Sequence, residues 1–115
     1  MRTHTISFRH AARGVVHATG TQLNLRLHLI ITTLVIFLSI LLEVSILEVL
    51  VLLLTIALVL TAELINTAIE YLGDAITLEN NEFLRNAKDV SAGAVLVSAI
   101  FAVLIGLTIF IPKLL

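Results

Sequence analysis

A row of acidic and amide side chains in the middle of the chain is the part of the sequence best suited to chemistry. Glu63, Asn66, Glu70 and Asp74 are spaced three or four residues apart. On an α-helix this spacing puts all four within an arc of roughly 80° and over about 16 Å of one face. In a chain without cysteine, these oxygen donors favour a hard cation such as Mg²⁺, which proteins commonly bind together with phosphates. The pattern predicts a cation site but does not distinguish an enzyme from a transporter.

The alternative for these acids is an ordinary helix end at a membrane surface, with its charges solvated. This alternative suits Asp74, Glu79 and Glu82, which lie among other polar residues. It suits Glu63 poorly, because the uncharged run 49–62 comes directly before it. A carboxylate next to lipid is costly and must face protein, water or metal. Glu63 is therefore the strongest candidate for a functional acid.

A second charged motif, Ala87-Lys88-Asp89, precedes the last apolar run of the chain. The Lys88 ammonium can pair with a phosphate as a point charge. Asp89 could bind a metal or a ribose, or orient a neighbouring ligand. The small residues 91–94 that follow would let helices approach closely. Together with the acid row, the motif is consistent with a bound nucleotide.

The segments that carry the acid row and the Lys88 motif are expected to lie in a membrane. Of the 115 residues, 59% are hydrophobic and 13% charged, against about 45–50% and about 25% in soluble domains. A chain this short cannot bury that much apolar surface in one soluble core, so a soluble globular enzyme is excluded. The absence of cysteine excludes disulfides, cysteine-based zinc sites and thiol nucleophiles. No phosphate-binding loop motif is present, and no nucleic acid partner is expected.

The pattern predicts an all-α membrane protein with three transmembrane helices at about 29–42, 49–72 and 90–111. An N-terminal amphipathic surface helix in the cytoplasmic segment 1–28 precedes them, and 1–115 forms a single domain. A spanning helix needs about 20 residues. The third segment meets this length without a charged residue between Ser91 and Ile111, whereas the first two need flanking polar residues or shelter from neighbouring helices.

Basic residues predict the orientation of these helices in the inner or plasma membrane. The link 43–48 contains no basic residue. Six basic residues lie before the first span or in the second connection: Arg2, Arg9, Arg13, Arg26, Arg85 and Lys88. The positive-inside rule places the N-terminus and the active site in the cytoplasm. Arg9 and Arg13 share one face of the first segment, where they either face anionic lipid headgroups or contribute to binding an anionic ligand.

The series Glu63-x-x-Asn66-Thr-Ala-Ile-Glu70-x-x-x-Asp74, followed by Ala87-Lys88-Asp89, resembles the small prokaryotic diacylglycerol kinase and undecaprenol kinase family. The resemblance covers nearly the whole chain, and the run Asn24-Leu-Arg-Leu-His28 is similar to the undecaprenol-type branch. It implies transfer of the ATP γ-phosphoryl group to a lipid alcohol, with undecaprenol slightly favoured over diacylglycerol. It also implies a homotrimer whose active sites combine residues of neighbouring subunits.

The resemblance also implies roles for individual residues. Glu63 would be the general base that takes the proton of the lipid hydroxyl, and Asn66 would orient the hydroxyl or the catalytic acid. Glu70 would hold Mg²⁺ bridging the ATP phosphates. Lys88 would neutralise phosphate charge. Two further acids match the nucleotide region: Asp74 and Asp89.

The chain departs from the family pattern at Gln22, where the family usually has a second metal-binding glutamate. An amide oxygen can still ligate Mg²⁺ but brings no negative charge. Weaker metal binding, compensation by another acid and loss of activity are all open at this point. The departure motivates one alternative function, a catalytically silent relative that acts as a membrane assembly protein. The acid face motivates another, a small cation or proton carrier.

Overall fold

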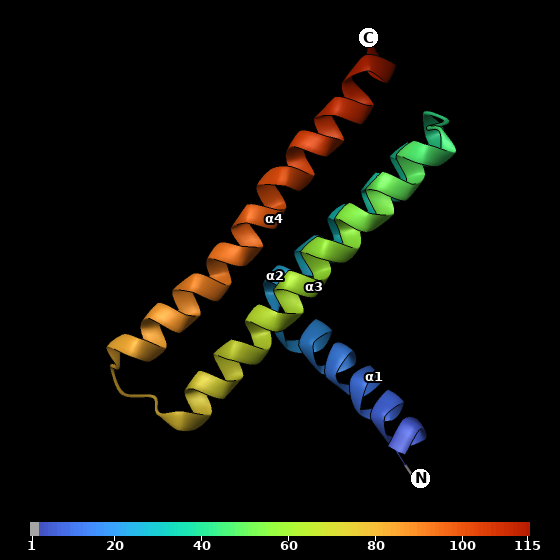
Figure 1. The fold of residues 1–115 in the computed structure, drawn as a ribbon. Coiled ribbons are helices and arrows are strands. Elements are labelled where there is room, and N and C mark those ends of the chain that lie inside the picture. The colour runs from blue at the N-terminus through green and yellow to red at the C-terminus, as the bar shows by residue number, and fades with distance from the viewer. Residues whose placement is uncertain (1–2) are drawn as a thin grey trace.

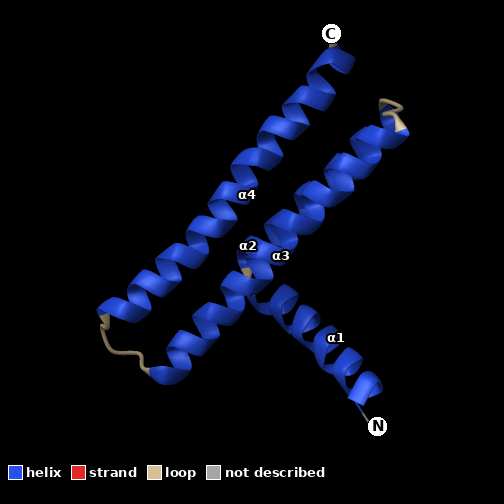
Figure 2. Ribbon diagram, viewed as in Figure 1, coloured by secondary structure: helices blue, strands red, loops and turns tan. Residues whose placement is uncertain are grey.

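The computed structural model describes the backbone of residues 3–115 and the side chains of residues 7–115, so that Arg2 lies outside the described residues. Four helices follow one another along the chain: α1 (Thr3–Thr21), α2 (Leu23–Leu41), α3 (Ile46–Ile76) and α4 (Glu82–Leu114) (Figure 1). The described residues contain no strand (Figure 2). By length and hydropathy, α2, α3 and α4 can each cross a membrane. The predicted all-helical class with three membrane helices is confirmed.

The helices extend beyond the apolar segments from which they were predicted. The segment 29–42 belongs to a helix that begins at Leu23, and the segment 90–111 to one that begins at Glu82. A helix satisfies its own backbone hydrogen bonds in water as well as in lipid, so it need not end where the apolar run ends. As a result, the acid row lies entirely within α3 and Lys88 lies within α4.

The central element of the fold is α3. Among the described residues, the backbones of α2 and α4 contact α3 but not each other, and α1 contacts α2 and α3 but not α4. Helices α3 and α4 run antiparallel side by side, whereas α1 turns away from them (Figure 1). The long third helix therefore carries the acid row past elements on two sides.

Local hydrogen bonds set the ends of these helices. A capping box begins α3, in which Ser45 and Glu48 exchange backbone and side-chain hydrogen bonds. The Oε1 of Glu48 also lies 3.0 Å from the Nζ of Lys113, which joins the start of α3 to the end of α4. The Asn81 side chain accepts a hydrogen bond from the backbone N–H of Leu84 at 3.1 Å and so begins α4.

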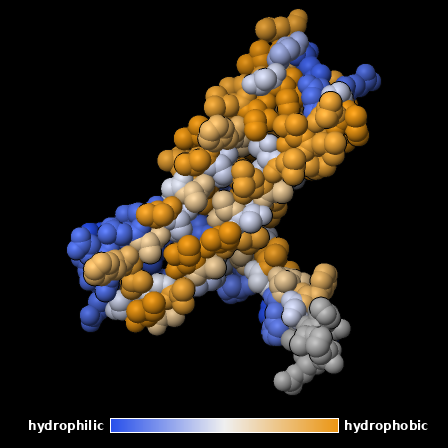
Figure 3. Space-filling view, in the orientation of Figure 1, coloured by the Kyte–Doolittle hydropathy of each residue, from blue (hydrophilic) through white to orange (hydrophobic). Residues whose placement is uncertain are grey.

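Most apolar side chains of the chain are exposed, as expected for surfaces that face lipid or another subunit. The buried hydrophobic residues among those described are few: Ala18, Leu25, Leu52, Val59, Ile109 and Phe110. In the space-filling view, apolar residues cover the middle of the long helices, and polar residues gather near both ends (Figure 3). The larger polar region lies around the link between α3 and α4 (Figure 3).

Candidate active site

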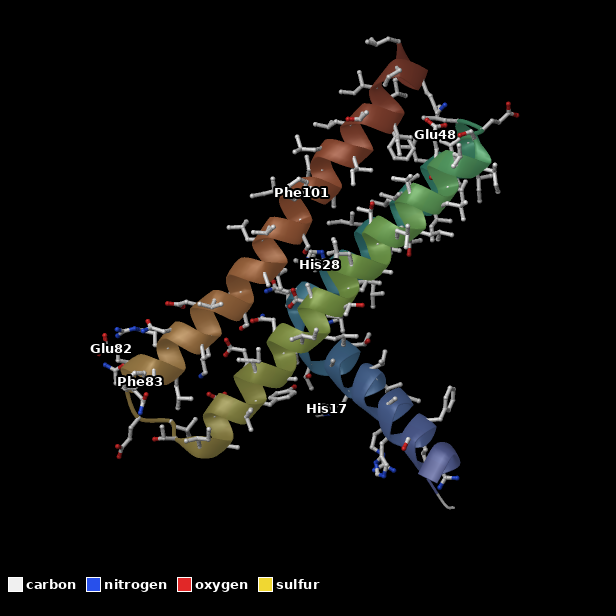
Figure 4. All side chains as sticks on the ribbon, in the orientation of Figure 1. His17, His28, Glu48, Glu82, Phe83 and Phe101 are labelled. Carbon is white, nitrogen blue, oxygen red and sulfur yellow. The ribbon has the colours of Figure 1, made fainter. Side chains whose placement is uncertain are left out.

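Glu63 occupies the driest position of the acid row. Its residue is 2% exposed, and no other ionisable residue among those described is buried. The Nε2 of His28, on α2, lies 3.6 Å from the Oε2 of Glu63. In Figure 4, His28 is labelled near the middle of the long helices, at a distance from the polar ends. One turn further along α3, the Thr67 hydroxyl donates to the backbone oxygen of Glu63 at 2.9 Å, so it leaves the carboxylate free.

Asn66 is held against α4 by a serine. The Ser91 hydroxyl donates to the Oδ1 of Asn66 at 2.6 Å and lies 2.9 Å from the backbone oxygen of Lys88. Ser91 is buried and Asn66 half-buried. The contact fixes the side chain of Asn66 between the buried Glu63 and the more open end of the row.

Lys88 reaches from α4 to the two outer acids of the row. Its Nζ donates to the Oδ1 of Asp74 at 2.6 Å and lies 3.8 Å from the Oε2 of Glu70. The lysine side chain passes directly over Gly73, where an added Cβ would lie 2.9 Å from the Lys88 Cε. Glycine at position 73 therefore lets the ammonium reach both carboxylates. The two acids and the lysine form a charged cluster that is half open to water.

Gln22 lies at the break between α1 and α2, where its extended backbone interrupts the helix. Its Nε2 donates to the Tyr71 hydroxyl at 3.1 Å, and the Thr21 Oγ1 lies 2.8 Å from the same hydroxyl. The His17 ring approaches the Tyr71 ring with centroids 5.7 Å apart. These contacts place Gln22 against α3 at the residue that follows Glu70 in the sequence.

Three residues proposed from the sequence take no part in these contacts within one chain: Asp89, Arg9 and Arg13. Asp89 is exposed on α4, although its neighbour Lys88 faces the acids. Arg9 and Arg13 are exposed on α1 and form no ion pair with another described residue. Because α1 does not contact α4, which carries Lys88, and no ion pair joins either arginine to Glu70 or Asp74, the two arginines take no part in the Lys88 cluster within one subunit.

An apolar groove of about 490 Å³ lies among α2, α3 and α4. His28 lines one part of it, and the rest extends past Val59 to Phe110 and Leu114 near the end of α4. The walls are aliphatic and aromatic apart from His28 and two threonines, Thr32 and Thr55. The groove therefore runs from His28, the side chain next to Glu63, into the apolar middle of the helices.

Sequence reasoning missed several residues that complete these contacts. The sequence pattern assigns no role to Tyr71, the one tyrosine of the chain, or to Gly73, and it marks Ser91 only as a small residue. His28 was noted only as part of a resemblance. The periodicity of one helix shows which of its residues share a face, but not which residues of other helices face them. The position of Tyr71 directly after Glu70 was the one available signal.

The charged cluster fits a magnesium ion bound together with phosphates. Among the described residues, no three His, Cys, Asp or Glu side chains converge as a complete metal-binding set. Mg²⁺ does not need one, because it commonly takes one or two carboxylates and completes its shell with substrate phosphates and water. Glu70 and Asp74, one helical turn apart, supply oxygen donors of this kind next to a cation that suits phosphate.

One family model and two known kinases are similar to this chain over most of its length. A family model described as prokaryotic diacylglycerol kinase matches residues 9–110. An undecaprenol kinase of Bacillus subtilis (strain 168) is 41% identical over 108 residues, which cover 94% of this chain and 88% of the relative. A diacylglycerol kinase of Synechocystis sp. (strain ATCC 27184 / PCC 6803 / Kazusa) is 42% identical over 111 residues, which cover 96% of this chain and 63% of that relative.

Proposed function

The chain belongs to the prokaryotic diacylglycerol kinase family and is an ATP-dependent lipid kinase, and on this premise we propose that its lipid substrate is undecaprenol. Two observations favour undecaprenol over diacylglycerol. The run from Asn24 to His28 is similar to the undecaprenol-type branch. The relative named undecaprenol kinase is matched over 88% of its length, against 63% for the diacylglycerol kinase.

The buried carboxylate of Glu63 carries the proposed mechanism. Glu63 takes the proton from the lipid hydroxyl as the hydroxyl oxygen forms a bond to the γ-phosphorus of ATP. The bond between that phosphorus and the oxygen bridging it to the β-phosphate breaks, and ADP leaves with the bond electrons. Asn66 helps to orient the reacting groups from its position against Ser91. A buried site favours this step because it keeps water from competing with the lipid hydroxyl.

The outer end of the row binds the nucleotide. Lys88 exchanges its carboxylate partners for phosphate oxygens, which a lysine binds as a point charge. Glu70 and the amide oxygen of Gln22 would hold Mg²⁺, which would supply positive charge to neutralise the phosphates and help to orient the γ-phosphoryl group. Asp74 and Asp89 complete the nucleotide region.

The same proposal includes a membrane orientation and an assembly. The N-terminus and the link between α3 and α4 face the cytoplasm, because the basic residues concentrate there. The surface helix α1 lies along the membrane and presents Arg9 and Arg13. Three copies assemble so that the arginines of one subunit reach the cluster of another. The separation of α1 from α4 within one chain supports this arrangement.

Phosphate transfer from labelled Mg·ATP by the purified protein in mixed micelles tests the proposal, with undecaprenol and diacylglycerol offered in parallel. We expect the wild type to label undecaprenol faster. Glu63→Gln should lower turnover by about 10²-fold or more while the affinity for Mg·ATP is kept, because only proton acceptance is lost.

The matched control is Glu79→Gln, the same substitution at an exposed acid of the α3–α4 link. It should turn over as the wild type does. A fully active Glu63→Gln variant would exclude Glu63 as the base. A wild-type protein that prefers diacylglycerol, or that labels neither lipid, would reject the proposed substrate.

A further inference from the structure

We propose that His28 binds the hydroxyl of the lipid substrate by donating a hydrogen bond to its oxygen, opposite Glu63. This inference rests on the proposed function, because it concerns the same site and the same substrate. It assigns a substrate-binding role to a residue on α2, whereas the proposed catalytic and metal-binding residues so far lie on α3, on α4 and at the start of α2.

The distance between the two side chains suits a bound hydroxyl. The His28 Nε2 and the Glu63 Oε2 are 3.6 Å apart, which is too long for a direct hydrogen bond. An oxygen atom can still lie about 2.8 Å from both atoms, within hydrogen-bond distance of each. A lipid hydroxyl there would accept from the His28 N–H and donate its own proton to Glu63. Its second lone pair would remain free to attack the phosphorus.

The apolar groove beside His28 commits this position to an alcohol on a long apolar chain. His28 is the one ionisable side chain in its lining. The two threonine hydroxyls in the lining are already used by their own helices. Thr32 donates to the backbone oxygen of His28 at 2.7 Å, and Thr55 donates to that of Val51 at 2.7 Å. The groove thus offers a ligand an apolar wall along its length and a single polar end, next to Glu63.

This arrangement identifies the occupant as the substrate's own hydrocarbon chain. One end of the groove is lined by His28, whose Nε2 lies 3.6 Å from the Oε2 of Glu63, and the groove lies among three helices that can cross a membrane. A lipid already in the membrane can therefore enter it without leaving an apolar environment. His28 would then select a lipid that ends in a hydroxyl, since a site built to hydrogen-bond an oxygen discriminates against ligands that lack one.

Substitutions at His28 separate hydrogen bonding from packing. His28→Leu keeps apolar volume and removes the donor. His28→Gln keeps a donor near the position of Nε2, and His28→Asn keeps one that is too short to reach it. His10→Leu, on the exposed surface of α1, is the matched control. Steady-state phosphorylation of undecaprenol in mixed micelles gives the KM for lipid and the KM for Mg·ATP of each variant.

We expect His28→Leu and His28→Asn to raise the lipid KM about tenfold, the upper range for one lost neutral hydrogen bond. The KM for Mg·ATP should stay within about twofold of wild type, and His28→Gln should keep most of the lipid affinity. Equal rises in both KM values, or no rescue by glutamine, would overturn the proposal. So would wild-type kinetics in His28→Leu.

A competitive inhibitor with the undecaprenyl chain but no hydroxyl provides the decisive comparison. It should inhibit the wild type and His28→Leu with the same inhibition constant, because it has no oxygen for His28 to bind. An inhibitor that loses affinity in His28→Leu would show that His28 packs against the chain, which overturns the proposal. These results stand apart from the proposed function, which is tested on the wild type alone and fails if the wild type prefers diacylglycerol or labels neither lipid.

Discussion

At the scale of single residues, the two ends of the acid row have different surroundings that suit different tasks. Glu63 is buried beside His28, whereas Glu70 and Asp74 are more open and face Lys88. A buried carboxylate is suited to accept a proton from a lipid. A partly exposed cluster that contains the Lys88 ammonium is suited to exchange a soluble nucleotide. The seven-residue spacing between Glu63 and Glu70 puts the two tasks about 10 Å apart along the helix axis.

Gly73→Ala tests whether the path of the Lys88 side chain matters. The new Cβ would lie 2.9 Å from the Lys88 Cε, so the flexible end of the lysine side chain must shift from its present path to Asp74 and Glu70. We expect the KM for Mg·ATP to rise several-fold, because the ammonium no longer reaches the phosphate position. Thermal unfolding should change little, since alanine is also a better helix former than glycine.

The control for this variant is Gly14→Ala, because a Cβ at that position meets no atom within 4 Å. Its nucleotide affinity should equal that of the wild type. If Gly73→Ala also kept wild-type affinity for Mg·ATP, the position of Lys88 in the cluster would be irrelevant to nucleotide binding.

At the scale of elements, α3 organises the site, and its beginning is closely controlled. The link before it reverses the chain through a Schellman motif at the end of α2. The Val44 N–H donates to the Ser39 oxygen at 3.2 Å, and the Glu43 N–H to the Ile40 oxygen at 3.3 Å. This motif requires a left-handed residue, and Glu43 adopts it with a φ of 51°. Glycine is the residue that usually takes this position, so the link carries local strain.

Glu43→Gly is therefore expected to stabilise the protein. Relief of the left-handed conformation, reduced by the extra freedom that glycine has in the unfolded chain, should give about 0.5–1 kcal/mol. Thermal unfolding in detergent micelles measures this as a higher Tm. Glu43→Ala removes the same charge without relieving the backbone and should not raise the Tm. Equal effects of glycine and alanine would mean that charge, not backbone conformation, limits stability here.

At the scale of the whole molecule, one subunit leaves parts of the proposed site apart. Helix α1 turns away from α3 and α4 and carries Arg9 and Arg13 with it (Figure 1). Most of the apolar surface of the long helices is also exposed in the single chain. Assembly of several copies in a membrane would cover part of that surface and bring arginines of one subunit to the lysine of another.

Mixed assemblies test this idea. The double variant Arg9→Ala/Arg13→Ala and the single variant Lys88→Ala should each bind Mg·ATP poorly. We assume that each site takes its arginines from one subunit and its lysine from the neighbouring subunit. When the two variants are co-expressed, random assembly into closed rings should then regenerate up to about one quarter of the wild-type sites. Activity of the mixture that only equals the mean of the separate variants would show that both parts come from one chain.

The helices and the composition of the acid row could be predicted from the amino-acid sequence. Apolar runs long enough to cross a membrane can bury their backbone only as helices, and the helical repeat then puts Glu63, Asn66, Glu70 and Asp74 on one face. The helix limits were less well predicted, because polar residues continue a helix beyond the apolar run. The motif predicted a phosphate as the partner of Lys88, and the contacts of Lys88 with Glu70 and Asp74 were not predicted.

Contacts between side chains of different helices could be read only from the packed structure. It brought His28 to Glu63, Ser91 to Asn66 and Gln22 to Tyr71, and it laid the Lys88 side chain over Gly73. It also separated Arg9 and Arg13 from the cluster within one chain. The physical reason is that the 3.6-residue repeat fixes directions within a helix, whereas the rotation of one helix against the next depends on how their side chains pack.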